Sequence, residues 1–180
     1  MLIANQKRKS NIAEYIIYMY QVEDTIRACK FDMDLIEKRI ISQYSINDTK
    51  KNDIRNWYSD LILMMHEENI TKAGHLSLIS GIISELFELH KNLLHIKKDP
   101  KYLELFAWAM PNIKAFGEKL GKEKGNDIDV CFSALYGLLL TRLQKKQLSE
   151  ETLHAMQTFS NLLAHLSSWF KKIEEGKAEI

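Results

Sequence analysis

Glu23, Arg27 and Arg142 are charged side chains that fall among apolar residues, and such groups can pair with one another or bind a ligand. Glu23 and Arg27 are four residues apart, the spacing and order that favour an ion pair on one face of a helix. Arg142 continues an apolar stripe through Phe132 and Leu139, so we expect at least the stem of its side chain to be buried. A buried charge is costly unless it is paired.

Two interpretations of these charged groups stay open. In the first, Glu23, Arg27 and Arg142 form an ionic network that ties two central helices together and is purely structural. In the second, these three residues, with Tyr20 or Tyr136, surround a pocket that holds an anionic or polar ligand. We predict no catalytic residue and no cofactor, and a structure without a cavity beside the two arginines would exclude the second interpretation.

The six histidines of the chain do not have the spacing of a metal site. A carboxylate-bridged di-iron bundle needs a pair of Glu-x-x-His motifs, and here only Glu151 and His154 have that spacing. Glu151 also stands where a glutamate is expected in the first turn of a helix. His90 falls on the apolar stripe of its helix, and we interpret it as a hydrogen-bonded core histidine. The sequence therefore predicts no metal site.

The candidate residues lie on two helices that we predict to be central and buried, over 11–29 and 127–147. All residues from Tyr15 to Tyr20 are apolar or aromatic, and a helix that is apolar all round is buried by neighbours on several sides. Periodic apolar stripes predict about seven helices and no strand, which indicates an all-α bundle. We expect one domain over 1–180, and flexible ends are predicted at 1–9 and 176–180.

Capping residues indicate where the helices begin, and small residues indicate one further feature of their packing. The predicted caps are Asn11, Asp32 or Asp34, Asn47 or Asp48, Asp99 before Pro100, Asn126 or Asp127, and Ser149. Pro111 interrupts a stripe that keeps its phase, so we expect a kinked helix there. Small residues recur at Ser77, Gly81 and Ser84 and at Ser133, Gly137 and Thr141, which predicts either close helix packing or a ligand slot.

The charge balance does not favour a nucleic-acid partner, because 25 basic and 24 acidic side chains give a net charge of +1. We expect the basic run Lys7–Lys9 to be a solvated chain start. Cys29 and Cys131 lie in apolar surroundings, and we interpret them as buried free thiols. Free thiols predict a reducing, cytoplasmic compartment. The longest apolar runs fall short of the ~20 residues of a membrane span, so we expect no membrane association.

The sequence also resembles a family of uncharacterised bacterial (Bacteroidetes) proteins of similar length, known as a domain of unknown function. The stretches that carry the resemblance are Leu2-Ile3-Ala4, Gln6-Lys7-Arg8-Lys9, Asn11-Ile12-Ala13-Glu14-Tyr15-Ile16, Gln21-Val22-Glu23-Asp24, Ile26-Arg27-Ala28, Cys131-Phe132, Ala134-Leu135-Tyr136-Gly137 and Arg142-Leu143-Gln144-Lys145-Lys146. The resemblance spans most of the chain. It implies a bacterial, cytoplasmic helical protein and transfers no catalytic residues.

Two classes of function remain. Our leading hypothesis is a non-enzymatic module that binds a protein partner or a second copy of itself, because the chain is rich in apolar residues and carries outlying aromatics such as Trp57, Trp108 and Trp169. The alternative is a small-molecule binding protein or enzyme that uses a pocket between the two central helices. A cavity with converging polar groups would favour the alternative.

Overall fold

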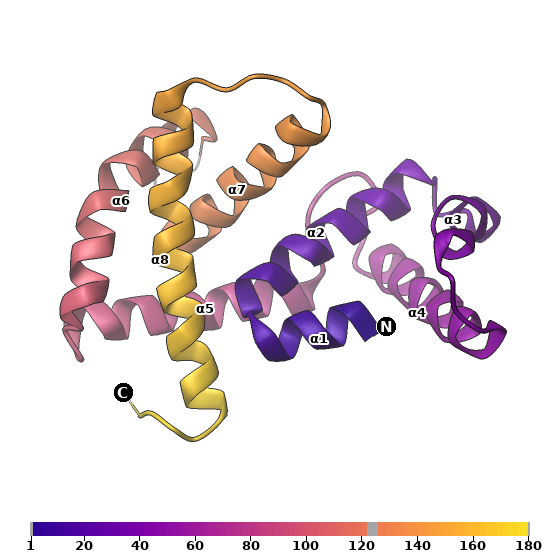
Figure 1. Ribbon diagram of the computed structural model, residues 1–180, viewed down its shortest axis with the longest axis horizontal. Coiled ribbons are helices and arrows are strands. Elements are labelled where there is room, and N and C mark those ends of the chain that lie inside the picture. Colours follow the sequence, from indigo (N-terminus) through magenta and orange to yellow (C-terminus); the bar gives the residue numbers. More distant parts are fainter. Residues whose placement is uncertain (1, 122–125, 180) are drawn as a thin grey trace.

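The computed structural model describes residues 2–121 and 126–179, and over these residues the chain is helical without any strand (Figure 1). The helices are α1 (Leu2–Ser10), α2 (Ile12–Ala28), α3 (Met33–Arg39), the short 3-10 helix η1 (Ile41–Gln43), α4 (Asp48–Glu67), α5 (Ser77–His95), α6 (Pro100–Lys119), α7 (Asp127–Leu143) and α8 (Glu150–Glu174). The all-α fold class is confirmed. None of the described helices is long and apolar enough to cross a membrane.

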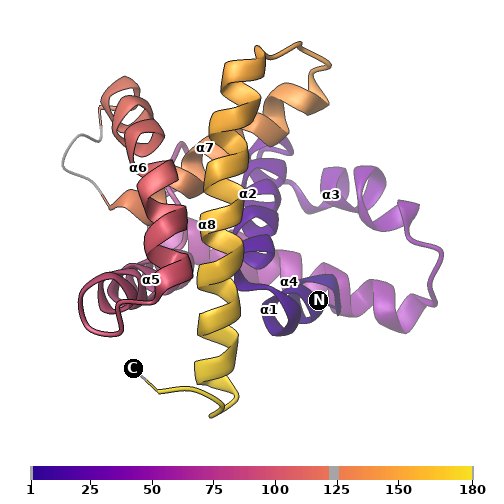
Figure 2. The ribbon, with the colours of Figure 1, turned by 60° about the vertical axis from the view of Figure 1, so that its left-hand side comes forward.

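Helix α2 connects the two parts of the fold. On one side it packs against α1, α7 and α8, and on the other it packs against α4 (Figures 1 and 2). Helices α5 to α8 pack against one another, whereas α3, η1 and α4 project away from them (Figure 1). Ile16 and Ile26 of α2 are completely buried. The prediction of a central, buried helix over 11–29 is therefore confirmed.

Most helices begin at the predicted capping residues. The side chain of Asn11 accepts hydrogen bonds from the backbone N–H groups of Ala13 and Glu14. The side chains of Asp32, Asn47, Asp99, Asn126 and Ser149 accept equivalent bonds in the first turns of α3, α4, α6, α7 and α8. These groups satisfy donors that have no partner inside the helix, and this local chemistry is readable from sequence.

Helix α7 differs from the prediction in its second half. Ile128, Cys131 and Phe132 in its first half are fully buried, but the helix ends at Leu143 rather than at 147, and Leu143 is 63% exposed. Arg142 is exposed as well, so the prediction of a buried stem was wrong. The physical reason is that the neighbouring helices cover only the first half of α7. Its apolar residues continue beyond the bundle.

The start of the chain is also more regular than predicted. Residues Leu2–Ser10 form α1, which packs against α2 where we had predicted a flexible end over 1–9. Arg8 forms two hydrogen bonds with the carboxylate of Glu174, at 2.6 and 2.9 Å, and its guanidinium lies over the ring of Phe170. The chain after Gly176 is not helical, and Met1 and Ile180 lie outside the described residues.

A polar network inside the core contains His90, as the sequence predicted. His90 is 2% exposed, its Nδ1 lies 2.8 Å from the hydroxyl of Tyr102, and its Nε2 lies 3.8 Å from a carboxylate oxygen of Asp127. Burial lowers the pKa of His90 from 6.5 to about 4, and the nearby His95 contributes in the same direction. The imidazole is therefore neutral in the folded protein at neutral pH.

We predict that His90 makes the protein less stable in acid. Its folded pKa lies below its unfolded pKa, so the unfolded state binds more protons between the two values. The stabilisation is complete above about pH 6.5 and is lost as the pH falls towards about 4, for a total of roughly 3 kcal/mol in the free energy of unfolding. Urea unfolding across this pH range measures the loss.

The control for this prediction is His90→Asn, which keeps a polar partner for Tyr102 and removes the titrating group. The neighbouring Asp127, whose pKa is raised by burial, is present in both proteins, so the difference between them reports His90 together with its coupling to Asp127. Equal losses of stability in both proteins on acidification would contradict the assignment.

Candidate functional site

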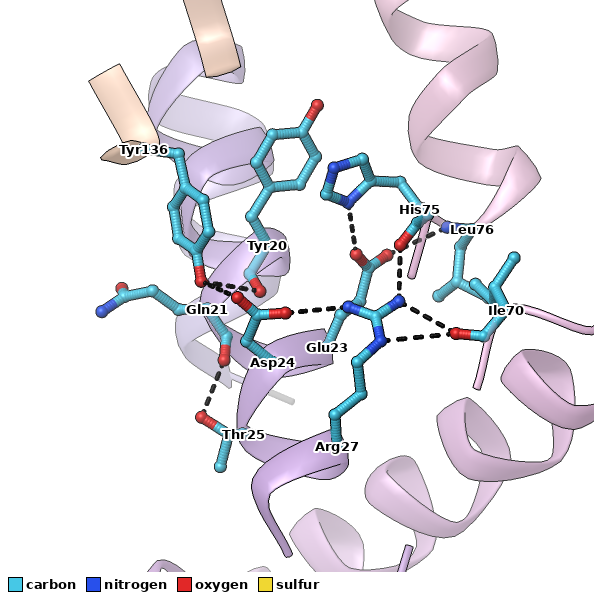
Figure 3. A network of polar contacts seen from close by, with 11 residues as sticks. Tyr20, Gln21, Glu23, Asp24, Thr25, Arg27, Ile70, His75, Leu76 and Tyr136 are labelled. Atoms are coloured by element: carbon cyan, nitrogen blue, oxygen red, sulfur yellow. Dashed lines mark hydrogen bonds and ion pairs between the residues drawn. The ribbon is translucent and has the colours of Figure 1, made fainter. Parts of the chain in front are cut away.

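The polar residues of α2 face the connection between α4 and α5, over residues 68–76. Tyr20, Glu23, Asp24 and Arg27 have the spacing of one helical face, and Figure 3 shows them converging on this connection and on Tyr136 of α7. Gly74 in the connection has a φ of +96°, a conformation that favours glycine. A Cβ added there would lie 3.3 Å from Cγ2 of Ile70. The connection is therefore tightly folded against itself as well as against α2.

Arg27 fixes this connection by its backbone. Its Nε and Nη2 donate to the carbonyl oxygen of Ile70 at 3.3 and 3.1 Å, and Nη2 also donates to the carbonyl of Gly74 (Figure 3). Nη1 donates to Asp24 at 2.9 Å. The side chain is only 15% exposed. Arg27 therefore pairs with Asp24 and with backbone carbonyls, and the predicted Glu23–Arg27 ion pair is replaced by these contacts.

Glu23 is completely buried and holds the start of α5. Its Oε1 accepts the backbone N–H of Leu76 at 3.0 Å, and its Oε2 lies 2.6 Å from Nδ1 of His75. Leu76 is the N-cap of α5 and provides no capping side chain of its own. Glu68 accepts the next backbone N–H, that of Ser77, at 2.6 Å. The two carboxylates thus take the place of a capping residue, and their negative charge suits a helix N-terminus.

The contact with Glu23 determines how His75 presents its ring. A carboxylate can only accept hydrogen bonds, so Nδ1 of His75 donates to Glu23, and in the neutral imidazole Nε2 is then the nitrogen with the lone pair. The imidazole stacks on the ring of Tyr20, with centroids 3.5 Å apart, and its side chain is 33% exposed (Figure 3). A histidine held in one orientation by a buried carboxylate can accept a proton from a bound molecule through Nε2.

Tyr20 has an unusual hydroxyl group. Its side chain is 1% exposed, and Oη has no hydrogen-bond partner among the described residues. Burial raises the pKa of Tyr20, and the negative charges of Asp129 and Glu23 raise it further. A buried polar group without a partner normally costs about 1–3 kcal/mol, so native structures contain few of them. The Tyr20 hydroxyl is a candidate ligand contact for this reason.

Tyr136 has a structural place in the same network. Its hydroxyl donates to Oδ2 of Asp24 at 2.6 Å and lies 3.3 Å from the carbonyl oxygen of Tyr20 (Figure 3). Its ring meets the ring of Tyr20 edge to face, with centroids 5.4 Å apart. Burial, together with the hydrogen bond to Asp24, raises the pKa of Tyr136. Tyr136 therefore connects α7 to α2.

A groove of about 320 Å³ lies beside Tyr20 and His75, and we call it the Tyr20–His75 groove. Its lining consists of Tyr20 from α2, His75 before α5, Ser80, Ile83 and Ser84 from α5, and Asn126 and Asp129 at the start of α7. Its size falls at the lower end of the range for ligand sites, about 300–1,000 Å³. The groove thus lies against the part of the network that contains Tyr20 and His75.

The stripe of small residues on α5 contributes to this groove rather than to close packing. Ser84 lines the groove, and a Cβ added at Gly81 would meet no atom within 4 Å. The same is true of Gly137 on α7, so neither glycine permits a close approach of two helices. For these positions the interpretation as close packing was wrong, and the ligand-slot interpretation is kept for Ser84 alone.

The structure brings together four of the five candidate ligand residues. Tyr20, Glu23, Arg27 and Tyr136 belong to one network, whereas Arg142 is exposed in the last turn of α7. Sequence reasoning missed His75 and Asp129. The only signal for His75 is its position between Gly74 and the first turn of a helix, and Asp129 looked like an ordinary acidic residue of a helix start. Their significance comes from contacts between distant segments.

The described residues contain no group of three or more histidine, cysteine, aspartate or glutamate side chains that could hold a metal ion. Both cysteines are free and buried, as predicted, and burial raises the pKa of the Cys131 thiol.

The chain belongs to the family described as Domain of unknown function (DUF4924), whose model matches residues 1–177. This result confirms the resemblance to an uncharacterised family. No curated protein and no solved structure matches the chain. The function therefore has to be argued from the geometry of the site.

We predict that Arg27→Ala destabilises the protein by roughly 2–4 kcal/mol, because it removes charge-assisted bonds to two backbone carbonyl groups and takes the cationic partner from Asp24. The free energy of unfolding in urea measures the change. Arg55→Ala is the matched control, because Arg55 is an exposed arginine paired with Glu37 at 3.3 Å, and we expect a loss below about 1 kcal/mol. Similar losses for both variants would show that Arg27 does not hold the connection.

Proposed function

We propose that this protein binds a small, hydroxylated, uncharged molecule in the Tyr20–His75 groove. The observation that carries the proposal is the Tyr20 hydroxyl, which is buried at the wall of the groove without a hydrogen-bond partner among the described residues. A ligand hydroxyl that bonds to it removes the cost of that unsatisfied group. The hydroxyl oxygen of Tyr20 therefore couples ligand binding to the stability of the groove.

The chemistry of the lining supports a polar but not an anionic ligand. Asp129 contributes a carboxylate, Ser80 and Ser84 contribute hydroxyl groups, and none of the described residues of the lining is a lysine or arginine. Arg27, which we had considered as an anion anchor, donates to Asp24 and to carbonyl oxygens instead. Arg142 is exposed at the far end of α7. Among the described residues of the groove, an anion would therefore meet a carboxylate and no cationic side chain.

His75 gives the proposed ligand its orientation. With Nδ1 bonded to Glu23, the lone pair of Nε2 accepts a hydrogen bond from a ligand O–H group. The imidazole of His75 stacks on the ring of Tyr20, so one polyol can contact both side chains. Glu23 thereby contributes to binding without touching the ligand.

We predict that Tyr20→Phe separates ligand binding from folding. Without ligand, the variant is as stable as the wild type or more stable by roughly 1–2 kcal/mol, because it removes an unsatisfied buried hydroxyl. With glycerol, sorbitol or glucose as probes, the wild type shows a rise in its melting temperature that the variant lacks. Differential scanning calorimetry with and without each probe measures both effects.

Tyr44→Phe is the control for this experiment, because Tyr44 is half-buried but is not part of the groove lining. It should keep the response to the probes. A Tyr20→Phe variant that is destabilised without ligand, or that responds to the probes like the wild type, would contradict the proposed role of the hydroxyl.

A second candidate function, self-association, is favoured by the uncovered half of α7. Leu140 and Leu143 are 36% and 63% exposed, although they belong to a helix with an apolar sequence on all sides. Exposed apolar surface of this kind is common where two protein surfaces meet. A second copy of the chain, with the same uncovered half of α7, is the occupant that this proposal names.

We predict that the protein dimerises in a concentration-dependent way and that Leu143→Lys shifts it to the monomer, because the lysine places a charge in the proposed contact. Sedimentation equilibrium measures the association. Leu63→Lys on α4 is the control, because Leu63 is 58% exposed in another part of the fold and its variant should still dimerise. A wild type that stays monomeric at all concentrations would exclude this candidate.

Two further attributes belong to the proposal. A cytoplasmic location is supported by the two free, buried thiols of Cys29 and Cys131, which suit a reducing compartment. An origin in the Bacteroidetes is supported by the resemblance of the sequence to that family.

A further inference from the structure

A second groove lies between α6 and α8, which pack side by side (Figure 2). Its volume is about 460 Å³, and we call it the Trp108 groove. Its lining consists of Ala107, Trp108 and Pro111 from α6 and of His154, Gln157, Thr158 and Asn161 from α8. None of these side chains is a lysine, arginine, aspartate or glutamate, so the groove suits an uncharged ligand.

Trp108 differs from the other two tryptophans of the chain. Trp57 packs against Tyr58 with ring centroids 5.1 Å apart, and the amino groups of Lys97 and Lys172 lie 5.4 and 5.3 Å from the ring centroid of Trp169. Trp108 is 59% exposed, and its ring has no aromatic or cationic contact among the described residues. An indole with an open face beside a groove is a surface on which a flat ring can stack.

Pro111 leaves one carbonyl group of α6 without its usual helical donor. Helix α6 continues through Pro111 on a curved path (Figure 1), as the sequence predicted. Proline has no N–H, so the carbonyl of Ala107, four residues earlier, cannot accept the usual helical bond. Ala107 and Pro111 both line the groove, together with Trp108.

The opposite wall of the groove carries amide groups in a fixed arrangement. Nε2 of Gln157 donates to Oδ1 of Asn161 at 2.9 Å, which orients both side chains. This bond leaves the Gln157 carbonyl as an acceptor and the Asn161 amide as a donor. The groove therefore combines an aromatic face with uncharged acceptors and a donor.

From these features we infer that the Trp108 groove is a binding site for an uncharged, planar heteroaromatic molecule that stacks on Trp108 and donates a ring N–H to the Ala107 carbonyl. This site is separate from the Tyr20–His75 groove and does not depend on the function proposed for it. Stacking supplies most of the affinity, and the N–H supplies the preference among flat ligands.

Benzimidazole and 1-methylbenzimidazole test the inference, because the two probes have the same bicyclic ring and only the first has a ring N–H. Calorimetric titration of the wild type should show benzimidazole binding roughly 3- to 10-fold more tightly, the range of one neutral hydrogen bond. In an amide nitrogen–proton NMR spectrum, the indole N–H signal of Trp108 should shift on titration while those of Trp57 and Trp169 stay in place. Trp108→Leu should weaken the binding of both probes roughly tenfold or more.

Pro111→Ala separates the acceptor from the stacking surface. It restores the N–H that the Ala107 carbonyl lacks, and alanine suits a helix interior, so the variant should fold at least as well as the wild type. It should bind the two probes with equal affinity. Pro100→Ala, at the first position of the same helix, is the matched control and should keep the preference.

Two results would overturn the inference. One is the absence of any shift of the Trp108 signal with millimolar probe. The other is a preference for benzimidazole that persists in Pro111→Ala or is missing in the wild type.

Discussion

The burial of the Glu23 carboxylate determines how the two parts of this fold are joined. A charge without water requires donors, and Glu23 finds them in the backbone N–H of Leu76 and in His75. Both lie in the connection between α4 and α5, and Arg27 fixes the same connection through the carbonyls of Ile70 and Gly74. One face of α2 thus provides donors for two carbonyls and an acceptor for one backbone amide of the segment between two helices.

This arrangement has a consequence for His75. The connection is where the chain passes from the projecting α3–α4 part to the α5–α8 body, and the contacts that hold it also present an oriented imidazole to solvent (Figures 1 and 3). For stability alone, a backbone N–H could donate to the second oxygen of Glu23, as the N–H of Leu76 donates to the first. The histidine at that position adds a group that can exchange a proton, and it lies beside an unsatisfied tyrosine hydroxyl.

The sequence predicted those features that depend on neighbours in the chain. Asn11, Asp99 and Ser149 cap helices as expected, because a cap requires only the next few residues. The central position of α2 followed from its apolar sequence on all sides. The partners of Arg27 could not be predicted, since they are carbonyl groups 43 and 47 residues away and every residue type has one. For Arg142 the helical phase indicated burial, but phase does not tell whether a neighbouring helix extends that far.

Both grooves occur where the backbone departs from regular helix, and this common origin explains their polar character. At the Tyr20–His75 groove the departure is the connection before α5, whose polar atoms are bonded by side chains of α2 and thereby bring His75 to the surface. At the Trp108 groove it is Pro111, which leaves a carbonyl without its helical donor. A bundle built only of regular helices satisfies its backbone internally and presents side chains alone. In this protein, the irregular backbone places hydrogen-bonding groups beside aromatic rings, the combination that a small ligand requires.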